Sequence, residues 1–142
     1  MPAAQRPLSR RLALLIAAAA VVVLGLALHF LAQGGIANFI TDALFTVMVY
    51  LLFGLIAPAA RRRWLALDAF ALSTAIEISQ LTGVPARLAE AFPPSRLVLG
   101  TTFSAPDIAA YALGAAAVWG ADRLLSALIS ARRGTWVPSR SE

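Results

Sequence analysis

Glu77 and Gln80 are the residues whose types and position most strongly suggest a functional site. They lie one helical turn apart inside residues 70–83, FALSTAIEISQLTG, a stretch apolar enough to cross a bilayer. An acidic side chain near the middle of a membrane costs about 2.5–3.5 kcal/mol on insertion scales, so it is normally kept only where another group pairs with it or uses it. We therefore interpret this pair as the centre of a buried polar site.

Further polar residues are expected to join this site. On a helix, Gln80 shares a face with Glu77. In the next apolar segment, Tyr111 shares a face with Asp107. Both polar faces are expected to turn inward, because lipid offers no hydrogen-bond partners. Arg96 lies in the intervening loop, where its fork of donors is expected to bind Glu77 or Asp107. The predicted binding set is Glu77, Gln80, Arg96, Asp107, Asp42 and Tyr111.

Some of these residues also have a structural interpretation. Asp107 is either a functional acid or a helix cap that accepts a hydrogen bond from the Ser104 amide. Asp42 is either a site residue or a favourable first-turn charge at the positive end of a helix dipole. His29 is interpreted as an interfacial side chain rather than a metal ligand. We predict no metal and no cofactor, and the residues do not identify a catalytic group.

The composition excludes an ordinary soluble domain. Of the 142 residues, 60% are hydrophobic and 13% are charged, and the mean hydropathy is +0.78. Soluble domains contain only about 45–50% apolar residues. The formal charge of +5 comes from arginines that cluster beside apolar runs, where they set topology, so nucleic-acid binding is not predicted. The absence of cysteine excludes disulfides and thiolate metal sites.

The apolar runs predict an all-α, polytopic membrane protein with four transmembrane helices in one small bundle. A cytoplasmic segment, 1–11, precedes the bundle, and a cytoplasmic tail, 130–142, follows it. The apolar core of the first helix exceeds the about 7–15 residues of a secretory signal peptide, which favours an uncleaved helix. The four helices are expected at about residues 12–32, 37–57, 64–82 and 106–129.

The arginines predict the orientation of these helices. If all four cross the membrane and the N-terminus is cytoplasmic, only Arg87 and Arg96 of the twelve basic residues lie outside, in agreement with the positive-inside rule. Asp68, near the inner end of the third helix, is expected to pair with the arginine run 61–63. The ten basic residues expected inside are Arg6, Arg10, Arg11, Arg61, Arg62, Arg63, Arg123, Arg132, Arg133 and Arg140.

Residues 84–105 form the one substantial predicted loop. A short amphipathic helix is expected at 86–92, ended by the two prolines that follow it. Residues 95–103 are apolar enough to lie on or dip into the outer interface, where they would act as a lid over the site.

The order of these features resembles a known family. The resemblance covers roughly residues 38–125, and its specific part runs from Glu77 to Gly114. These residues resemble a family of short bacterial inner-membrane proteins with a domain of unknown function, sometimes labelled the ribosomal maturation YjgA family. They are also similar to the wider VanZ-like group, which is linked to glycopeptide resistance and the cell envelope. The resemblance implies a fold and a location but no reaction. The residues that carry it are Asp42, Glu77-Ile78-Ser79-Gln80-Leu81, Arg96-Leu97, Gly100, Phe103, Asp107, Ala110-Tyr111 and Gly114.

We predict an accessory, non-enzymatic protein of the bacterial cytoplasmic membrane with both termini cytoplasmic. Its outward-facing pocket is expected to bind a polar or cationic group, such as a lipid headgroup or an envelope precursor. One alternative is an ion- or proton-coupled transport component in which Glu77 titrates. Another is a small intramembrane enzyme that acts on a headgroup, with Glu77 or Asp107 as general base. The lipid bilayer is the expected partner, and the sequence does not indicate an oligomeric state.

Overall fold

The computed structural model describes residues 7–134, with side chains described for residues 10–131. This part of the chain is all-α, as predicted, and it contains six α-helices and two short 3-10 helices. Segments 1–6 and 135–142, which belong to the predicted cytoplasmic ends, lie outside the described residues. The elements in chain order are α1 (Pro7–Leu31), α2 (Gly35–Ile56), α3 (Arg62–Ser79), η1 (Gln80–Thr82), α4 (Val84–Ala91), η2 (Pro93–Ser95), α5 (Arg96–Leu99) and α6 (Ala105–Gly134).

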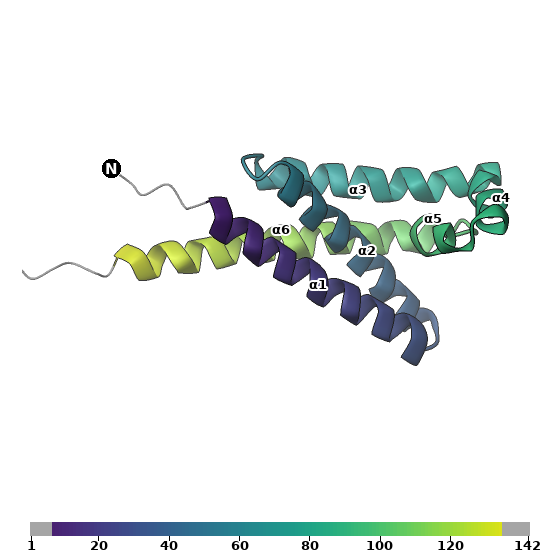
Figure 1. Ribbon diagram of the computed structural model, residues 1–142, viewed down its shortest axis with the longest axis horizontal. Coiled ribbons are helices and arrows are strands. Elements are labelled where there is room, and N and C mark those ends of the chain that lie inside the picture. Colours follow the sequence, from purple (N-terminus) through teal and green to yellow (C-terminus); the bar gives the residue numbers. More distant parts are fainter. Residues whose placement is uncertain (1–6, 135–142) are drawn as a thin grey trace, which may run out of the picture.

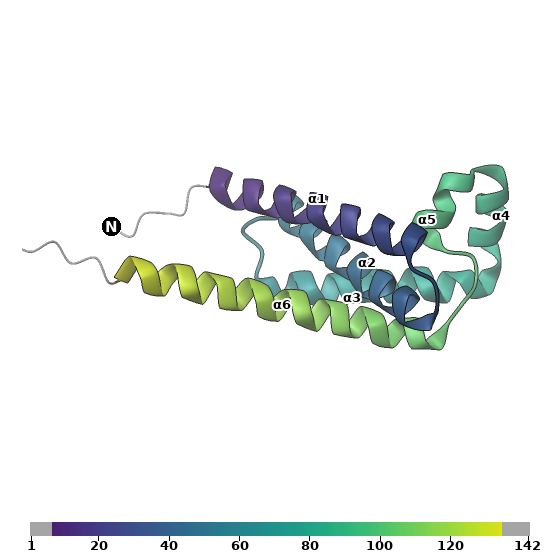
Figure 2. The same cartoon turned by 90° about the horizontal axis from the view of Figure 1, so that it is seen from below.

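Four long helices form an elongated bundle. Helices α3 and α6 run side by side, and α1 and α2 form a hairpin that crosses them at an incline (Figure 1). Helix α1 packs mainly on α2 and does not pack along α6, so these two helices lie along opposite sides of the molecule (Figure 2). The short helices α4 and α5 gather at one end of the bundle, which we call the loop end. Both described chain ends lie at the other end (Figures 1 and 2).

The turn between α1 and α2 occurs at the glycine pair Gly34-Gly35. Gly34 has a φ of +111°, a conformation that residues with a Cβ rarely adopt. Helix α2 starts directly after it at Gly35, two residues earlier than predicted. At the C-terminal side, α6 continues to Gly134, five residues beyond the predicted end of the fourth span.

Helices α2 and α6 approach each other closely where small residues meet. A Cβ added to Gly114 of α6 would overlap the backbone carbonyl of Ala43 in α2. Close backbone approach at small residues is the usual way in which membrane helices pack. Away from this contact, seven buried apolar residues form a core between α1, α2 and α3: Leu14, Val49, Tyr50, Leu51, Leu65, Ala66 and Ala69.

Three of the described helices are long and apolar enough to cross a membrane, which fits a membrane protein. They contain residues 10–31, 35–56 and 105–131. The prediction of a fourth such helix at 64–82 was wrong, because Arg62, Arg63, Asp68 and Glu77 lower the hydropathy of α3. The polar side chains of Ser73 and Glu77 are buried against other helices, whereas a hydropathy average treats every residue as if it faced lipid.

Large apolar side chains cover the outside of the bundle. On α1, for example, Leu12, Val23 and Phe30 are each at least 60% exposed. Monomeric soluble proteins rarely expose contiguous apolar surface of this extent. The outer surface of α1 is therefore suited to contact with lipid.

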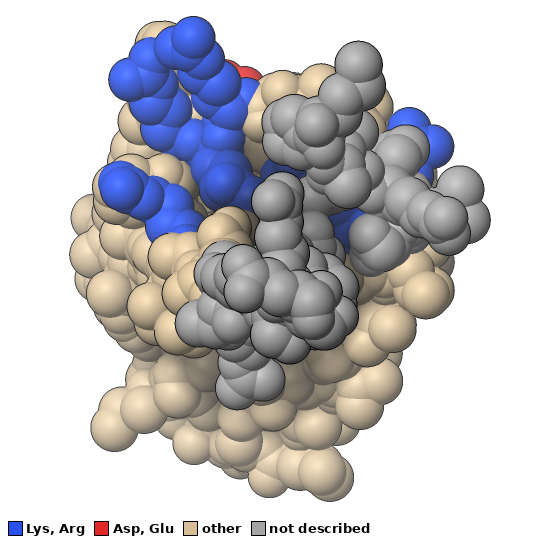
Figure 3. All heavy atoms as spheres, turned by 90° about the vertical axis from the view of Figure 1, so that its left-hand side faces the viewer, with Lys and Arg blue, Asp and Glu red and all other residues tan. Residues whose placement is uncertain are grey.

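The end of the bundle opposite the loop end carries most of the arginines, and we call it the arginine end. Figure 3 looks onto this end, where basic side chains form most of the charged surface in view. Asp68 is exposed and has no salt bridge among the residues with described side chains, so its predicted pairing with the arginine run was wrong. Arg62 instead pairs with Asp122 of α6, with 2.9 Å between Nε and Oδ1.

Candidate functional site

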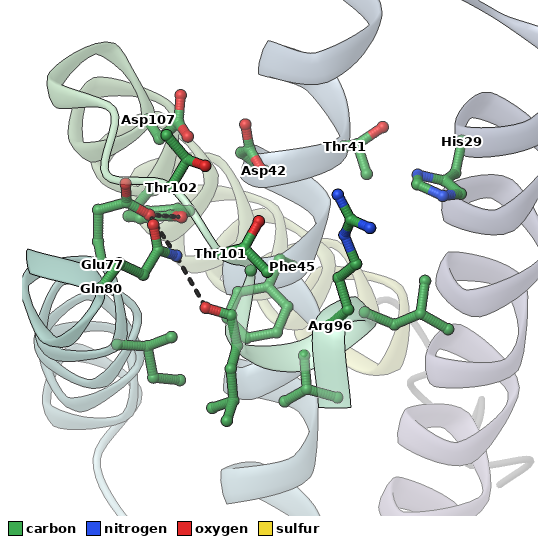
Figure 4. Close-up of a pocket in the computed structure, with 16 residues that line it drawn as sticks. His29, Thr41, Asp42, Phe45, Glu77, Gln80, Arg96, Thr101, Thr102 and Asp107 are labelled. Atoms are coloured by element: carbon green, nitrogen blue, oxygen red, sulfur yellow. Dashed lines mark hydrogen bonds between the residues drawn. The ribbon is translucent and has the colours of Figure 1, made fainter. Parts of the chain in front are cut away.

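A cavity of about 530 Å³ lies at the loop end, between α2, α3 and α6 and beside α5 (Figure 4). All six residues of the predicted binding set line it, although they come from four different elements and from η1. The other polar side chains in its lining are His29, Thr41, Thr101 and Thr102. The structure therefore brings the predicted residues together around a single space.

Glu77 is the most completely enclosed of these residues, with 1% of its surface exposed. Its Oε1 accepts a hydrogen bond from the Ser104 backbone N–H at 2.5 Å. Its Oε2 accepts one from the Tyr111 hydroxyl at 2.8 Å and one from the Gln80 Nε2 at 3.3 Å. A buried carboxylate needs such donors to replace lost hydration. Glu77 thus ties α3 to α6 and to the loop before α6.

Gln80 fixes the segment that follows α5. Besides the bond to Glu77, its Nε2 donates to the Leu99 carbonyl at 2.8 Å. The next residue, Gly100, has a φ of +61°, and a Cβ placed there would collide with the Gln80 side-chain amide. The glycine therefore satisfies two requirements at once, a left-handed backbone and space for the Gln80 amide.

Asp107 does not cap α6 in the way the sequence suggested. The Ser104 amide that was expected to bond to Asp107 is occupied by Glu77. Ser104 instead donates its hydroxyl to Asp107 Oδ1 at 2.6 Å. Ser104 therefore connects the two acids, with its backbone on one and its side chain on the other.

Asp42 is not a first-turn charge. Because α2 begins at Gly35, Asp42 lies about two turns into the helix, so the helix-dipole interpretation was wrong. Its half-buried carboxylate lies within electrostatic range of Asp107 and Glu77, and no residue with a described side chain donates a hydrogen bond to it. In Figure 4, Asp42 lies on the same side of the cavity as Asp107 and Thr102.

Arg96 does not bind the acids as predicted. It forms no salt bridge within the part of the chain whose side chains are described, and it is exposed. Its guanidinium points toward the side of the cavity where Thr41 and His29 lie, away from Glu77 (Figure 4). Glu77 has no need of this cation because three uncharged donors already satisfy its oxygens.

Sequence reasoning missed part of the site. His29 was treated as an interfacial side chain, yet it lines the cavity and packs edge-on against Phe30, with ring centroids 5.0 Å apart. The Ser104 amide was assigned to another acid. Thr101 and Thr102 carried only one available signal, their position directly after a glycine in the predicted lid.

Charges of opposite sign line opposite walls of the cavity. Asp42 and Asp107 supply carboxylates on one wall, and Arg96 supplies a guanidinium near His29 on the other. Such walls suit a ligand that carries both a cationic and an anionic group. The three donors to Glu77 leave it poorly placed to accept a proton from a substrate. Among the residues that the structure describes, no cluster of His, Asp and Glu is arranged to hold a metal ion.

A row of polar residues on α2 continues from the cavity toward the arginine end. Asp42, Thr46 and Tyr50 recur at every fourth position and so share one helix face. Thr46 donates its hydroxyl to Ser73 Oγ of α3 at 3.0 Å. The Tyr50 hydroxyl donates to Asp122 Oδ2 of α6 at 2.6 Å. Neither Tyr50 nor Asp122 belongs to the binding set predicted from the sequence.

Comparison with protein families gives a match to DUF2809, described as a protein of unknown function, over residues 31–115. This match spans more than half of the chain. The chain belongs to the DUF2809 family. Comparison with curated proteins and with solved structures found no match. The predicted resemblance to a family of unknown function is confirmed to this extent, whereas the YjgA label and the link to VanZ-like proteins stay predictions.

The part of the chain that matches DUF2809 contains the whole predicted binding set. It runs from the last residue of α1 through the first third of α6 and includes each element that lines the cavity except α1. Arg10 of α1 and Asp122 of α6 lie outside the matched residues. The cavity at the loop end is thus built almost entirely from the DUF2809 region.

Proposed function

We propose that this DUF2809 protein is a multi-pass protein of the bacterial cytoplasmic membrane whose cavity at the loop end binds the headgroup of a lipid or of a lipid-linked envelope precursor. In this proposal the arginine end is cytoplasmic, because ten of the twelve basic residues are assigned to that side. Helix α3 lies in the membrane with α2 and α6, since it packs against both. The predicted resemblance to VanZ-like proteins favours a role in the cell envelope.

The observation that carries the proposal is the continuity of the polar cavity with an apolar groove. A second hollow of about 320 Å³ lies between α1 and α2 beneath α5, with walls that include Val21, Val22, Leu26, Leu44 and Met48. Its lining shares five residues with the polar cavity: His29, Thr41, Phe45, Leu97 and Val98. An amphiphile would place its headgroup in the cavity and its chain in the groove.

The charges of the cavity favour a headgroup that carries a primary amine and a phosphate. The amine would lie near Asp42 and Asp107, and the phosphate near Arg96, whose planar fork suits phosphate oxygens. Glu77 has an organising role in this arrangement, because its hydrogen bonds hold Tyr111 and the loop at Ser104 in place.

Lipid binding by the purified protein tests this proposal. Dioctanoyl phosphatidylethanolamine would be titrated in a non-ionic detergent and followed by native mass spectrometry. Asp42→Asn should weaken its binding about tenfold, equivalent to about 1.4 kcal/mol. Arg96→Gln should weaken binding to a similar degree. Glu90→Gln and Arg87→Gln on exposed positions of α4 are matched controls and should leave it unchanged.

Two results would contradict the headgroup assignment. Equal binding of dioctanoyl phosphatidylethanolamine to the native protein and to Asp42→Asn would show that the acidic wall does not contact the amine. Loss of affinity in Glu90→Gln as large as in Asp42→Asn would show that the effect comes from surface charge in general.

The proposed orientation is tested separately by cysteine labelling, which the natural absence of cysteine makes simple. Single cysteines replacing Ile36 and Glu90 should react with an impermeant thiol reagent added outside the cell. A cysteine replacing Arg61 should react only after the membrane is permeabilised. All three residues are exposed, so failure to label would reflect sidedness rather than burial. Labelling of position 90 from the cytoplasm alone would overturn the orientation.

The polar row on α2 favours a second candidate function, a proton-coupled transport component. A proton route would need polar groups in the half of the bundle nearer the arginine end. The paired hydroxyls of Thr46 and Ser73, and the bond from Tyr50 to Asp122, add polar groups along that path. Liposomes containing the protein and an internal pH dye would report a proton leak that falls in Tyr50→Phe. Equal rates in protein-containing and empty liposomes would exclude this function.

A further inference from the structure

A further hollow, with both charged and apolar walls, lies at the arginine end. It is far from the cavity at the loop end, which we call the headgroup cavity. The hollow at the arginine end has a volume of about 430 Å³ and is lined by α1, α2, α6 and Arg62, the first residue of α3. Its walls come mainly from α1 and α6, which lie along opposite sides of the molecule (Figure 2). We call this hollow the arginine groove.

Two guanidinium groups converge on one carboxylate at the head of the arginine groove. Arg62 Nε lies 2.9 Å from Asp122 Oδ1, and Arg10 Nη2 lies 3.8 Å from Asp122 Oδ2. Arg62 Nη2 also donates to Ser126 Oγ at 2.7 Å, and Arg10 Nη1 donates to the Pro58 carbonyl. These contacts hold both side chains in place before any ligand arrives, which lowers the entropic cost of binding.

The charges in this cluster do not cancel. Arg10 and Arg62 carry two positive charges, Asp122 carries one negative charge, and the Tyr50 hydroxyl is an uncharged donor to Asp122. The side chains of the two arginines are only 25% and 33% exposed, so solvent screens the excess positive charge less than on an open surface. The cluster is therefore electrostatically suited to an anion.

The remaining walls of the arginine groove are apolar. They are contributed mainly by Leu14, Leu51, Leu125 and Ile129, with Ala121 on the α6 side. An inorganic anion would leave these walls without a partner. An anionic lipid would place its phosphate beside the guanidinium groups and an acyl chain along the apolar walls.

We propose that the arginine groove is a binding site for a phospholipid with a net negative headgroup. The site is separate from the headgroup cavity, and it differs in selectivity because it has an excess of positive charge and no free acid. Arg10 and Asp122 lie outside the DUF2809 match and Arg62 lies inside it, so this site combines the matched region with the helices that flank it. Arg62 acts here as a structural and binding residue as well as a topological signal.

The test compares three probes on the purified full-length protein in a non-ionic detergent: dioctanoyl phosphatidylglycerol, dioctanoyl phosphatidylcholine and sodium phosphate. Native mass spectrometry should show the phosphatidylglycerol bound about tenfold more tightly than the phosphatidylcholine. Arg10→Gln should abolish this selectivity. Ala121→Trp, which fills the groove and leaves every charge in place, should weaken phosphatidylglycerol binding as well.

The matched control is Arg123→Gln. Arg123 is an arginine of α6 that stacks on Trp119, 5.0 Å from the ring centroid, and does not line the groove. This variant should bind phosphatidylglycerol as the native protein does.

Equal affinity for both lipids, full binding in Ala121→Trp, or an equal loss in Arg123→Gln would each overturn the proposal. Displacement of the lipid by sodium phosphate at equal concentration would overturn it too, because the apolar walls would then contribute nothing. Phosphatidylethanolamine binding at the loop end should be unaffected by Arg10→Gln, so the two sites fail or succeed independently.

Discussion

The Ser104 amide donates a hydrogen bond to Glu77 Oε1 at 2.5 Å, across 27 positions of sequence. This bond joins the C-terminal end of α3 to the loop that leads from α5 into α6. The same carboxylate accepts the Tyr111 hydroxyl, so a single side chain fixes both the loop and the first turns of α6. The shape of the headgroup cavity therefore depends on Glu77 even if a ligand never contacts it.

Glu77→Gln should loosen the loop and destabilise the bundle. The amide that replaces one carboxylate oxygen is itself a donor, so it must face either the Ser104 N–H or the Gln80 Nε2, and neither group can accept a hydrogen bond. Leaving a buried donor without its partner costs about 1–3 kcal/mol. Unfolding by sodium dodecyl sulfate in mixed micelles measures this loss, and hydrogen exchange should show a less protected Ser104 amide. Unchanged protection of that amide would argue against the bond, and Glu90→Gln on exposed α4 is the control.

Gly100→Ala should displace the Gln80 amide. The substitution forces a residue with a Cβ into a φ of +61° and places that Cβ against Gln80 Nε2. A strained backbone of this kind costs about 1–3 kcal/mol, and loss of the bond from Gln80 to Leu99 would add to it. Hydrogen exchange at residues 96–104 should become faster. Gly25→Ala is the control, since nothing lies within 4 Å of its added Cβ; equal effects at both positions would refute the argument.

Gly114→Ala should push α2 and α6 apart. The added methyl group would overlap the Ala43 carbonyl, which belongs to a helix backbone and cannot rotate away. Overpacking of this kind costs about 1–3 kcal/mol. Gly120→Ala on the same helix meets open space and should be neutral or stabilising by about 0.5–1 kcal/mol. Unfolding free energies that change in the same direction in both variants would show that the contact between the helices is unimportant.

Local sequence signals predicted much of the fold because the helix boundaries are set locally. The glycine pair after α1, Pro58 after α2 and Gly83 after η1 each break a helix through their own backbone chemistry. Burial of Glu77 also followed from its cost in lipid alone. Its juxtaposition with Tyr111 followed from helix periodicity combined with the inward turn of polar faces.

The choice among chemically equivalent partners depended on helix packing and could not be predicted. Asp68 and Asp122 are both acids near the arginine end, yet only the rotation of α6 relative to α3 determines that Asp122 meets Arg62. Ser104 lies three residues before Asp107, so the sequence suggested a local hydrogen bond between its amide and Asp107. Only the tertiary fold brings the same amide to Glu77. The hydropathy of α3 falls short of that of the three apolar helices, because an average over the sequence counts Ser73 and Glu77 as if they faced lipid, although both are buried.

Tyr50→Phe should destabilise the arginine end without changing the headgroup cavity. The variant removes a 2.6 Å hydrogen bond from a buried hydroxyl to the Asp122 carboxylate, and bonds to charged groups contribute about 1.5–3 kcal/mol. A double-mutant cycle with Asp122→Asn isolates this bond from the loss of the two arginine contacts.

Tyr111→Phe, which removes the matching bond to Glu77, is the control for loss of a buried tyrosine hydroxyl. We expect a coupling of about 0.5–3 kcal/mol between Tyr50 and Asp122 and none between Tyr111 and Asp122. Additive effects of Tyr50→Phe and Asp122→Asn would show that the hydroxyl and the carboxylate act separately, and the polar row on α2 would then end at Thr46.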